Sequence, residues 1–168
     1  MEVRKSQIIN ASCIYIEGIG FLGTSAEVEI PAIEFETYEQ NGGFYKQNLN
    51  TGILKAMTAK FIVSEFNSVI YESFSKQFNK SNPSNLYVKW NVSSPKGHFD
   101  HIATFRGDIT KHTPPKVAAG EEVKCEFELQ LSFLKLEDYG VESVLIDTNN
   151  LICRIGGTDL WEEIRSNL

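Results

Sequence analysis

A stretch of alternating residues at positions 123–133 constrains the fold of this chain more than any other feature. Its odd positions are apolar and its even positions polar, in the order Val-Lys-Cys-Glu-Phe-Glu-Leu-Gln-Leu-Ser-Phe. Because side chains on a strand point alternately to opposite faces, this pattern predicts a strand with one buried and one wet face. After Phe133 the alternation shifts phase and continues at Leu134 and Leu136, which predicts a β-bulge.

The length of this strand is informative as well. From Val123 to Leu136 it would span about 46 Å at about 3.3 Å per residue. Most strands of globular domains are shorter. A closed domain of 168 residues rarely needs such a strand, whereas a sheet shared between subunits can use one.

The rest of the chain also favours strands. A stripe of apolar residues at helical spacing, from Phe66 to Phe78, predicts one helix that packs on a sheet, with Ser64 as its cap. A short closing helix is predicted to begin after Thr158. The expected fold is a single mainly β domain over 1–168, a sandwich or barrel of antiparallel strands with these two helices. Its strand candidates, besides the long one, are 13–16, 26–30, 33–38, 53–63, 86–92, 102–110, 115–119, 144–146 and 151–155.

Residues 39–52 lack the apolar patterns that predict strands elsewhere in the chain. They are polar and contain Gly42, Gly43 and Gly52. The stretch is too long for a tight turn, so the sequence predicts a long flexible loop, which is either a plain surface loop or one ordered by a neighbouring molecule.

Composition narrows the possible functions. The formal net charge is −6 and there is no basic tail, which argues against a protein that grips nucleic acid through its phosphates. The widely spaced Cys13, Cys125 and Cys153 suggest buried free thiols in a reducing compartment rather than a disulfide framework. No apolar run approaches the roughly 20 residues of a membrane span, so no membrane role is expected.

Two motifs could indicate a cofactor site or a metal site, but a structural role explains each of them better. Residues 18–23 match the glycine pattern of a dinucleotide site, but the next residues are strand-like and no helix starts there to meet a pyrophosphate. His98 and His101 lie close together, but residues three apart on a strand point to opposite faces and no cysteine lies nearby. No cofactor or metal is expected.

Glu126 and Glu128 lie on the wet face of the long strand and should point the same way. Paired carboxylates can act as acid and base. Without a pocket or a partner group, a solvated or channel-lining surface is the better interpretation, so no catalytic residue is expected.

Several stretches together resemble the major tail tube protein of contractile-tailed temperate phages and R-type pyocins. The similarity covers nearly the whole chain in the same order. The stretches that carry it are 16–23, 27–31, the glycines at 42 and 43, 105–107 and the closing segment 146–159.

This resemblance implies a structural protein with a tail tube fold related to the tube of type VI secretion systems. Family members form six-subunit rings that stack into a hollow tube inside a contractile sheath, and DNA leaves through the tube. The implied partners are further copies of the chain, the sheath protein, the baseplate or tail initiator and the tape measure protein. The implied location is the virion, after assembly in the bacterial host cytoplasm.

The long strand predicted at 123–136 is consistent with assembly into rings, because such a strand suits a sheet that is joined edge to edge between neighbouring subunits. We therefore expect Glu126 and Glu128 to face the lumen, where acidic side chains would let DNA pass without specific binding. The candidate subunit contacts are Gly42, Gly43, Phe44, Tyr45 and Trp161. Two alternatives stay open, namely an inner tube of a secretion or injection machine and a monomeric β-barrel that binds a small ligand.

Overall fold

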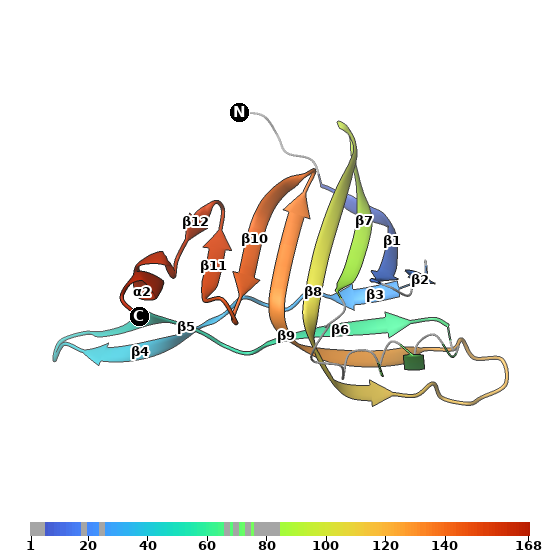
Figure 1. The fold of residues 1–168 in the computed structure, drawn as a ribbon, viewed down its shortest axis with the longest axis horizontal. Helices are drawn as coiled ribbons and strands as arrows, with labels where there is room; N and C mark the ends of the chain where they lie inside the picture. Colours follow the sequence, from blue (N-terminus) through green and yellow to red (C-terminus); the bar gives the residue numbers. More distant parts are fainter. Residues whose placement is uncertain are drawn as a thin grey trace.

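The computed structural model describes residues 6–17, 20–23, 26–65, 68, 71, 72, 75 and 85–168. The protein is mainly antiparallel β (Figure 1), which confirms the predicted fold class. The described elements are β1 (Ile8–Ile16), β2 (Gly20–Gly23), β3 (Ala26–Glu29), β4 (Phe35–Asn41), β5 (Lys46–Leu54), β6 (Met57–Val63), β7 (Leu86–Ser94), β8 (Gly97–Thr113), β9 (Cys125–Asp138), β10 (Val141–Asp147), β11 (Ile152–Ile155), β12 (Thr158–Asp159) and α2 (Glu162–Ser166).

The alternating stretch forms β9, and β9 belongs to two sheets. Its first half pairs with β6, from Cys125 to Leu131, and its second half pairs with β10, from Phe133 to Asp138. On its other side β9 pairs with β8 along nearly its whole length. These ten strands form one hydrogen-bonded network that branches at β9, and we treat its two arms as two sheets. One runs in the order β12-β11-β10-β9-β8-β7-β1-β2, and the second runs β3-β6-β9-β8.

The predicted bulge lies where β9 passes from one sheet to the other. Arg106 of β8 lies opposite Phe133, but Gly107 lies opposite Leu131, so Ser132 is the extra residue. The backbones approach closely here, because a Cβ atom on Gly107 would collide with the carbonyl oxygen of Gln130. The shift of the apolar face from odd to even positions is thus confirmed, and its cause is this bulge.

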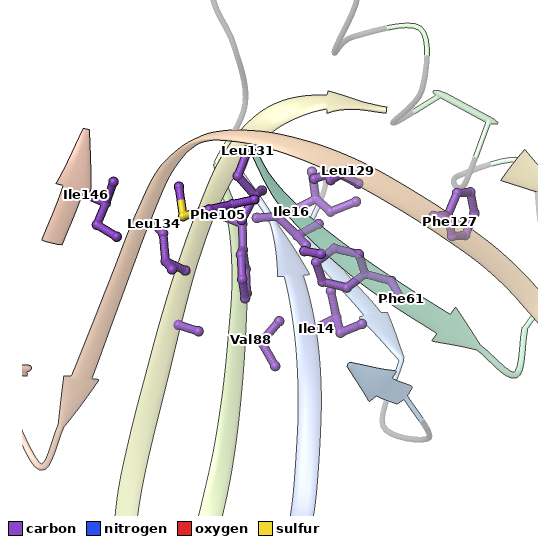
Figure 2. Packing of buried hydrophobic residues seen from close by; sticks show 14 of the residues in the cluster. Ile14, Ile16, Phe61, Val88, Phe105, Phe127, Leu129, Leu131, Leu134 and Ile146 are labelled. Atoms are coloured by element: carbon purple, nitrogen blue, oxygen red, sulfur yellow. The ribbon is translucent and has the colours of Figure 1, made fainter. Parts of the chain in front are cut away.

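The hydrophobic core fills the space between the two sheets. Figure 2 shows Phe61 of β6 and Phe105 of β8 among the buried side chains, and their rings meet edge to face at 5.4 Å between centroids. Full burial of one such side chain contributes about 1.5–3 kcal/mol. All three cysteines are free thiols, of which Cys125 and Cys153 are buried and Cys13 is half-buried.

The prediction of a long loop at 39–52 is wrong, because most of this segment forms the hairpin β4–β5. Gly43 has φ +84° at the turn, and its amide donates to Asn41 Oδ1 at 3.1 Å. At the left of Figure 1 the hairpin extends away from the other strands. Nearly all its side chains are exposed, so it lacks the alternation of apolar and polar residues that marks a half-buried strand.

Two other predicted boundaries are also wrong. Residues 115–119 lie in the connection between β8 and β9 rather than in a strand, because the adjacent Pro114 and Pro115 cannot donate backbone hydrogen bonds. Thr158 lies in β12 and does not cap the closing helix. The side chain of Asp159 instead accepts a hydrogen bond from the amide of Trp161 at 3.0 Å, directly before α2.

The predicted helix over 66–78 lies mostly outside the described residues. Ser68, Tyr71, Glu72 and Ser75 are described, and all are helical. The Tyr71 ring meets the His112 ring of β8 edge to face at 5.5 Å between centroids. In the described part of the chain, no helix combines the length and the hydropathy needed to cross a membrane.

Candidate functional site

The wet face of the sheet β3-β6-β9-β8 carries a row of alternating charges. The strand registers place Glu29 of β3 opposite Lys60 of β6, Lys60 opposite Glu128 of β9, and Glu128 opposite Lys111 of β8. We call these four residues the charged row. Its order is acid, base, acid, base, so the two outermost strands end it with opposite charges.

Glu126 and Glu128 both lie on this face, as the sequence predicted, and both are ion-paired. Glu126 lies 3.0 Å from Lys60 Nζ and Glu128 lies 3.2 Å from Lys111 Nζ. The hydrogen bond with Glu126 is the main cause that raises the pKa of Lys60. The sequence alone does not identify these lysine partners, because they lie on other strands, β6 and β8, and become neighbours only through the register in which those strands pair with β9. A lumen position for both carboxylates stays a prediction.

The sheet that carries the charged row has an edge at each side. In the part of the chain that the structure describes, β8 pairs with β7 only up to Phe105, and from Arg106 onward it pairs with β9 alone. On the other side, β3 lies near β1, but among the described residues it pairs in register only with β6. Unpaired strand edges are templates for pairing with another chain.

The β4–β5 hairpin presents aromatic side chains at its tip. Phe44 is fully exposed, and Tyr45 is 57% exposed. Gly42 and Gly43 form the turn, where the Gly42 amide donates to the Tyr45 carbonyl oxygen at 2.9 Å. Four of the predicted contact residues are thus brought together at one protruding point, and their contact with a neighbouring subunit stays a prediction.

Trp161, the fifth predicted contact residue, lies inside the subunit. It is 9% exposed, and its Nε1 donates to the carbonyl oxygen of Gly52 in β5 at 3.0 Å. Asp159 next to it accepts hydrogen bonds from Arg165 at 2.9 Å and from the Trp161 amide. Although burial raises the pKa of Asp159, these bonds lower it overall. Trp161 therefore anchors the hairpin from within, and its role at a subunit contact stays a prediction.

The two chemically suggestive motifs have structural roles. The described part of the glycine motif, Gly20–Gly23, forms β2 and pairs with β1, so no helix begins there. His101 Nδ1 lies 2.6 Å from Asp138 Oδ1, and its ring stacks on Trp90 at 5.5 Å between centroids. His98 Nδ1 instead lies 2.8 Å from Ser93 Oγ. Among the described residues, no group of three or more His, Cys, Asp or Glu side chains is placed to hold a metal ion.

Solved structures with a similar fold come from contractile machines. One is a cryo-EM structure of an extracellular contractile injection system, the PVC sheath-tube complex in the extended state. Its TM-score is 0.54 at 12% identity, over 76% of this chain and 88% of that chain. Another is the PVC sheath/tube terminator in the extended state, with a TM-score of 0.55 at 12% identity over 75% and 92% of the two chains. At this identity the similarity concerns the fold alone.

Comparison with protein families gives a match over almost the whole chain. The phage tail tube protein FII family matches residues 6–168. A search among curated proteins finds no match. The family consists of structural tail tube proteins, which fits the expectation that this chain has no catalytic residue. Membership in this family does not favour the two alternatives, a ligand-binding barrel and a secretion tube. The chain belongs to the phage tail tube protein FII family, and its role is that of a structural component of a phage or phage-like tail.

Proposed function

We propose that copies of this chain join edge to edge into closed rings, and that the rings stack into the hollow inner tube of a contractile tail. The observation that carries this proposal is the four-stranded sheet β3-β6-β9-β8, whose outer strands β3 and β8 both keep an edge in the described residues. Joining these edges between neighbours would satisfy their backbone groups and leave this four-stranded sheet without an exposed edge.

The strand directions support a ring. Neighbouring strands of this sheet are all antiparallel, so β3 and β8 run in opposite directions. Copies related by rotation about one axis would then place β8 of one copy antiparallel to β3 of the next. Every junction would continue the pattern found inside the subunit, and a head-to-tail contact of this kind closes into a ring when the rotation allows.

Stacking of rings would use the β4–β5 hairpin. Its tip carries Phe44 and Tyr45 on a turn at Gly42 and Gly43, away from the rest of the subunit. Fully exposed aromatic side chains are a common feature of protein contacts. Trp161 would contribute to the same contact indirectly, because its hydrogen bond to Gly52 holds the base of the hairpin in position.

The wet face of the sheet would line the lumen, with Glu126 and Glu128 on it. On that face the acidic residues outnumber Lys60 and Lys111, since Glu27, Glu29 and Asp108 also occupy positions in register with it. A net negative lining repels phosphates, so DNA would pass without binding.

Family membership supports the partners and the location that we propose. They are further copies of this chain, the sheath protein, the baseplate or tail initiator and the tape measure protein. The subunit would assemble in the bacterial host cytoplasm and act in the virion without a cofactor, a membrane or any catalysis.

Electron microscopy of the purified protein tests the proposal. The protein is imaged over a range of concentrations, alone and with preassembled tube or baseplate as a seed. We expect rings or hollow tubes that become longer when a seed is present. A protein that stays monomeric at all concentrations even with the seed would overturn the proposal.

A further inference from the structure

We infer that Glu29 of one copy and Lys111 of the next form an ion pair across each ring junction, and that this pair sets the register in which the sheets join. The inference rests on the edge-to-edge assembly proposed above. It adds the residues that determine how neighbouring copies align.

The charged row is the first support. Inside the subunit each member lies opposite a residue of the other sign, from Glu29 through Lys60 and Glu128 to Lys111. The row begins on one edge strand of the sheet and ends on the other. A rotated copy therefore places the basic end of its row beside the acidic end of its neighbour, and the alternation continues without a break.

The geometry of the two ends is the second support. Glu29 is exposed, and the Lys111 side chain keeps 57% of its surface exposed although its Nζ already lies 3.2 Å from Glu128. Residues directly opposite on paired strands have Cβ atoms about 4.5–5.5 Å apart, which suits a Glu–Lys pair. An ammonium group has three donors, so Lys111 can hold both carboxylates.

The neighbouring charges discriminate between registers. A slip by one residue would turn Glu29 to the opposite face of the sheet. A slip by two residues would bring Lys111 opposite Glu27, but it would also move Glu29 toward Asp108, which lies on the same face opposite Gln130. Like charges facing each other across strands are unfavourable. The register with Glu29 opposite Lys111 avoids this contact.

A charge exchange tests the inference. The variants are Glu29→Lys, Lys111→Glu and the double variant, and Glu27→Lys is the matched control with the same charge change on the same strand. Assembly is measured as the concentration at which half of the protein sediments as tubes, with one seed preparation for all variants. Thermal unfolding of the monomers identifies any variant that fails to fold.

We expect each single change to raise this concentration about tenfold, since close charge pairs at interfaces often couple by at least this much. The double variant should assemble at a lower concentration than either single variant, short of the wild type because the exchange places like charges opposite Lys60 and Glu128 inside the subunit. Glu27→Lys should stay near the wild type. Single variants that assemble like the wild type, or a double variant without rescue, would overturn the inference and leave the ring proposal intact. A wild type that never assembles would instead overturn both.

Cross-linking gives a second measurement. Cysteines at 29 and 111 should form an intermolecular disulfide on mild oxidation. Directly opposite Cβ atoms lie about 4.5–5.5 Å apart, or closer in a non-hydrogen-bonded pair, so a small shift brings them to the about 3.5–4.5 Å of a disulfide. We expect a ladder of covalent oligomers from assembled Glu29→Cys/Lys111→Cys protein and a much weaker ladder from the Glu27→Cys/Lys111→Cys control. A stronger ladder from the control would show that the register is slipped by two residues.

Discussion

The indole nitrogen of Trp161 donates a hydrogen bond to the carbonyl oxygen of Gly52 at 3.0 Å, across 109 residues of sequence. Gly52 lies in β5 with φ +76°, and its own amide donates to Asn50 Oδ1 at 2.8 Å. The C-terminal segment thus determines where the β4–β5 hairpin leaves the rest of the subunit. Most of the hairpin's own side chains are exposed and contribute little to its position.

Replacement of Trp161 by Phe tests this anchor. The change keeps an aromatic side chain in the core but removes the donor to Gly52. We expect the free energy of unfolding to fall by about 1 kcal/mol, the usual net contribution of one hydrogen bond, and seeded assembly to slow because the hairpin is less well held. Urea unfolding and sedimentation measure the two effects. Trp90→Phe is the control, and equal slowing of its assembly would contradict the specific role of Trp161.

The bulge between β8 and β9 requires glycine at 107. In Gly107→Ala the new methyl group would meet the backbone of Gln130 and Leu131, and the strands would have to move apart. We expect a loss of about 1–3 kcal/mol in the free energy of unfolding, as for other overpacked sites. Asp108→Ala, at the adjacent exposed position, should change this free energy by less than about 0.5 kcal/mol. Equal stability of the two variants would show that the bulge tolerates a side chain.

The Asp138 carboxylate makes stability depend on acid pH. A hydrogen bond from Ser143 at 2.6 Å is the main cause that lowers its pKa below the ordinary 3.8, and His101 adds to the effect against the opposing effect of burial. A lowered pKa in the folded state stabilises the protein above pH 3.8, and this contribution is lost as the pH falls through the folded value.

Ser143→Ala should therefore raise the pKa of Asp138. It should also cost stability at pH 7, and the cost should shrink as the pH falls below 3.8. An NMR titration of the Asp138 carboxyl carbon and thermal unfolding across the acid range measure both effects. Ser166→Ala is the matched control, since the Ser166 hydroxyl donates to a backbone carbonyl instead. A cost that stays constant with pH would contradict this account.

The hairpin tip should matter for assembly and not for folding. Phe44→Ser removes a fully exposed ring, so the free energy of unfolding should change by less than about 0.5 kcal/mol. If the tip contacts the neighbouring ring, the tubes should become shorter or disappear in electron micrographs. Leu168→Ser, another change at a highly exposed apolar residue, is the control. Normal tubes from Phe44→Ser would contradict a stacking role for the tip.

What the sequence alone determined lies mainly in β9. The period of two identified the strand, its buried face and its phase shift, and it placed Glu126 and Glu128 on one side. These features could be predicted because a strand's alternation is a local property of its own residues. The order of motifs along the sequence also indicates the family to which the chain belongs.

The tertiary structure decided which residues meet. Lys60 and Lys111 became the partners of the two glutamates only because β6 and β8 pair with β9 in one register. The hairpin at 39–52 has no periodic apolar pattern in its sequence, since nearly all its side chains are exposed. The hydrogen bond from Trp161 to Gly52 could not be predicted from the sequence around either residue. Such contacts depend on how separate segments pack together, and the local sequence of one segment does not specify that arrangement.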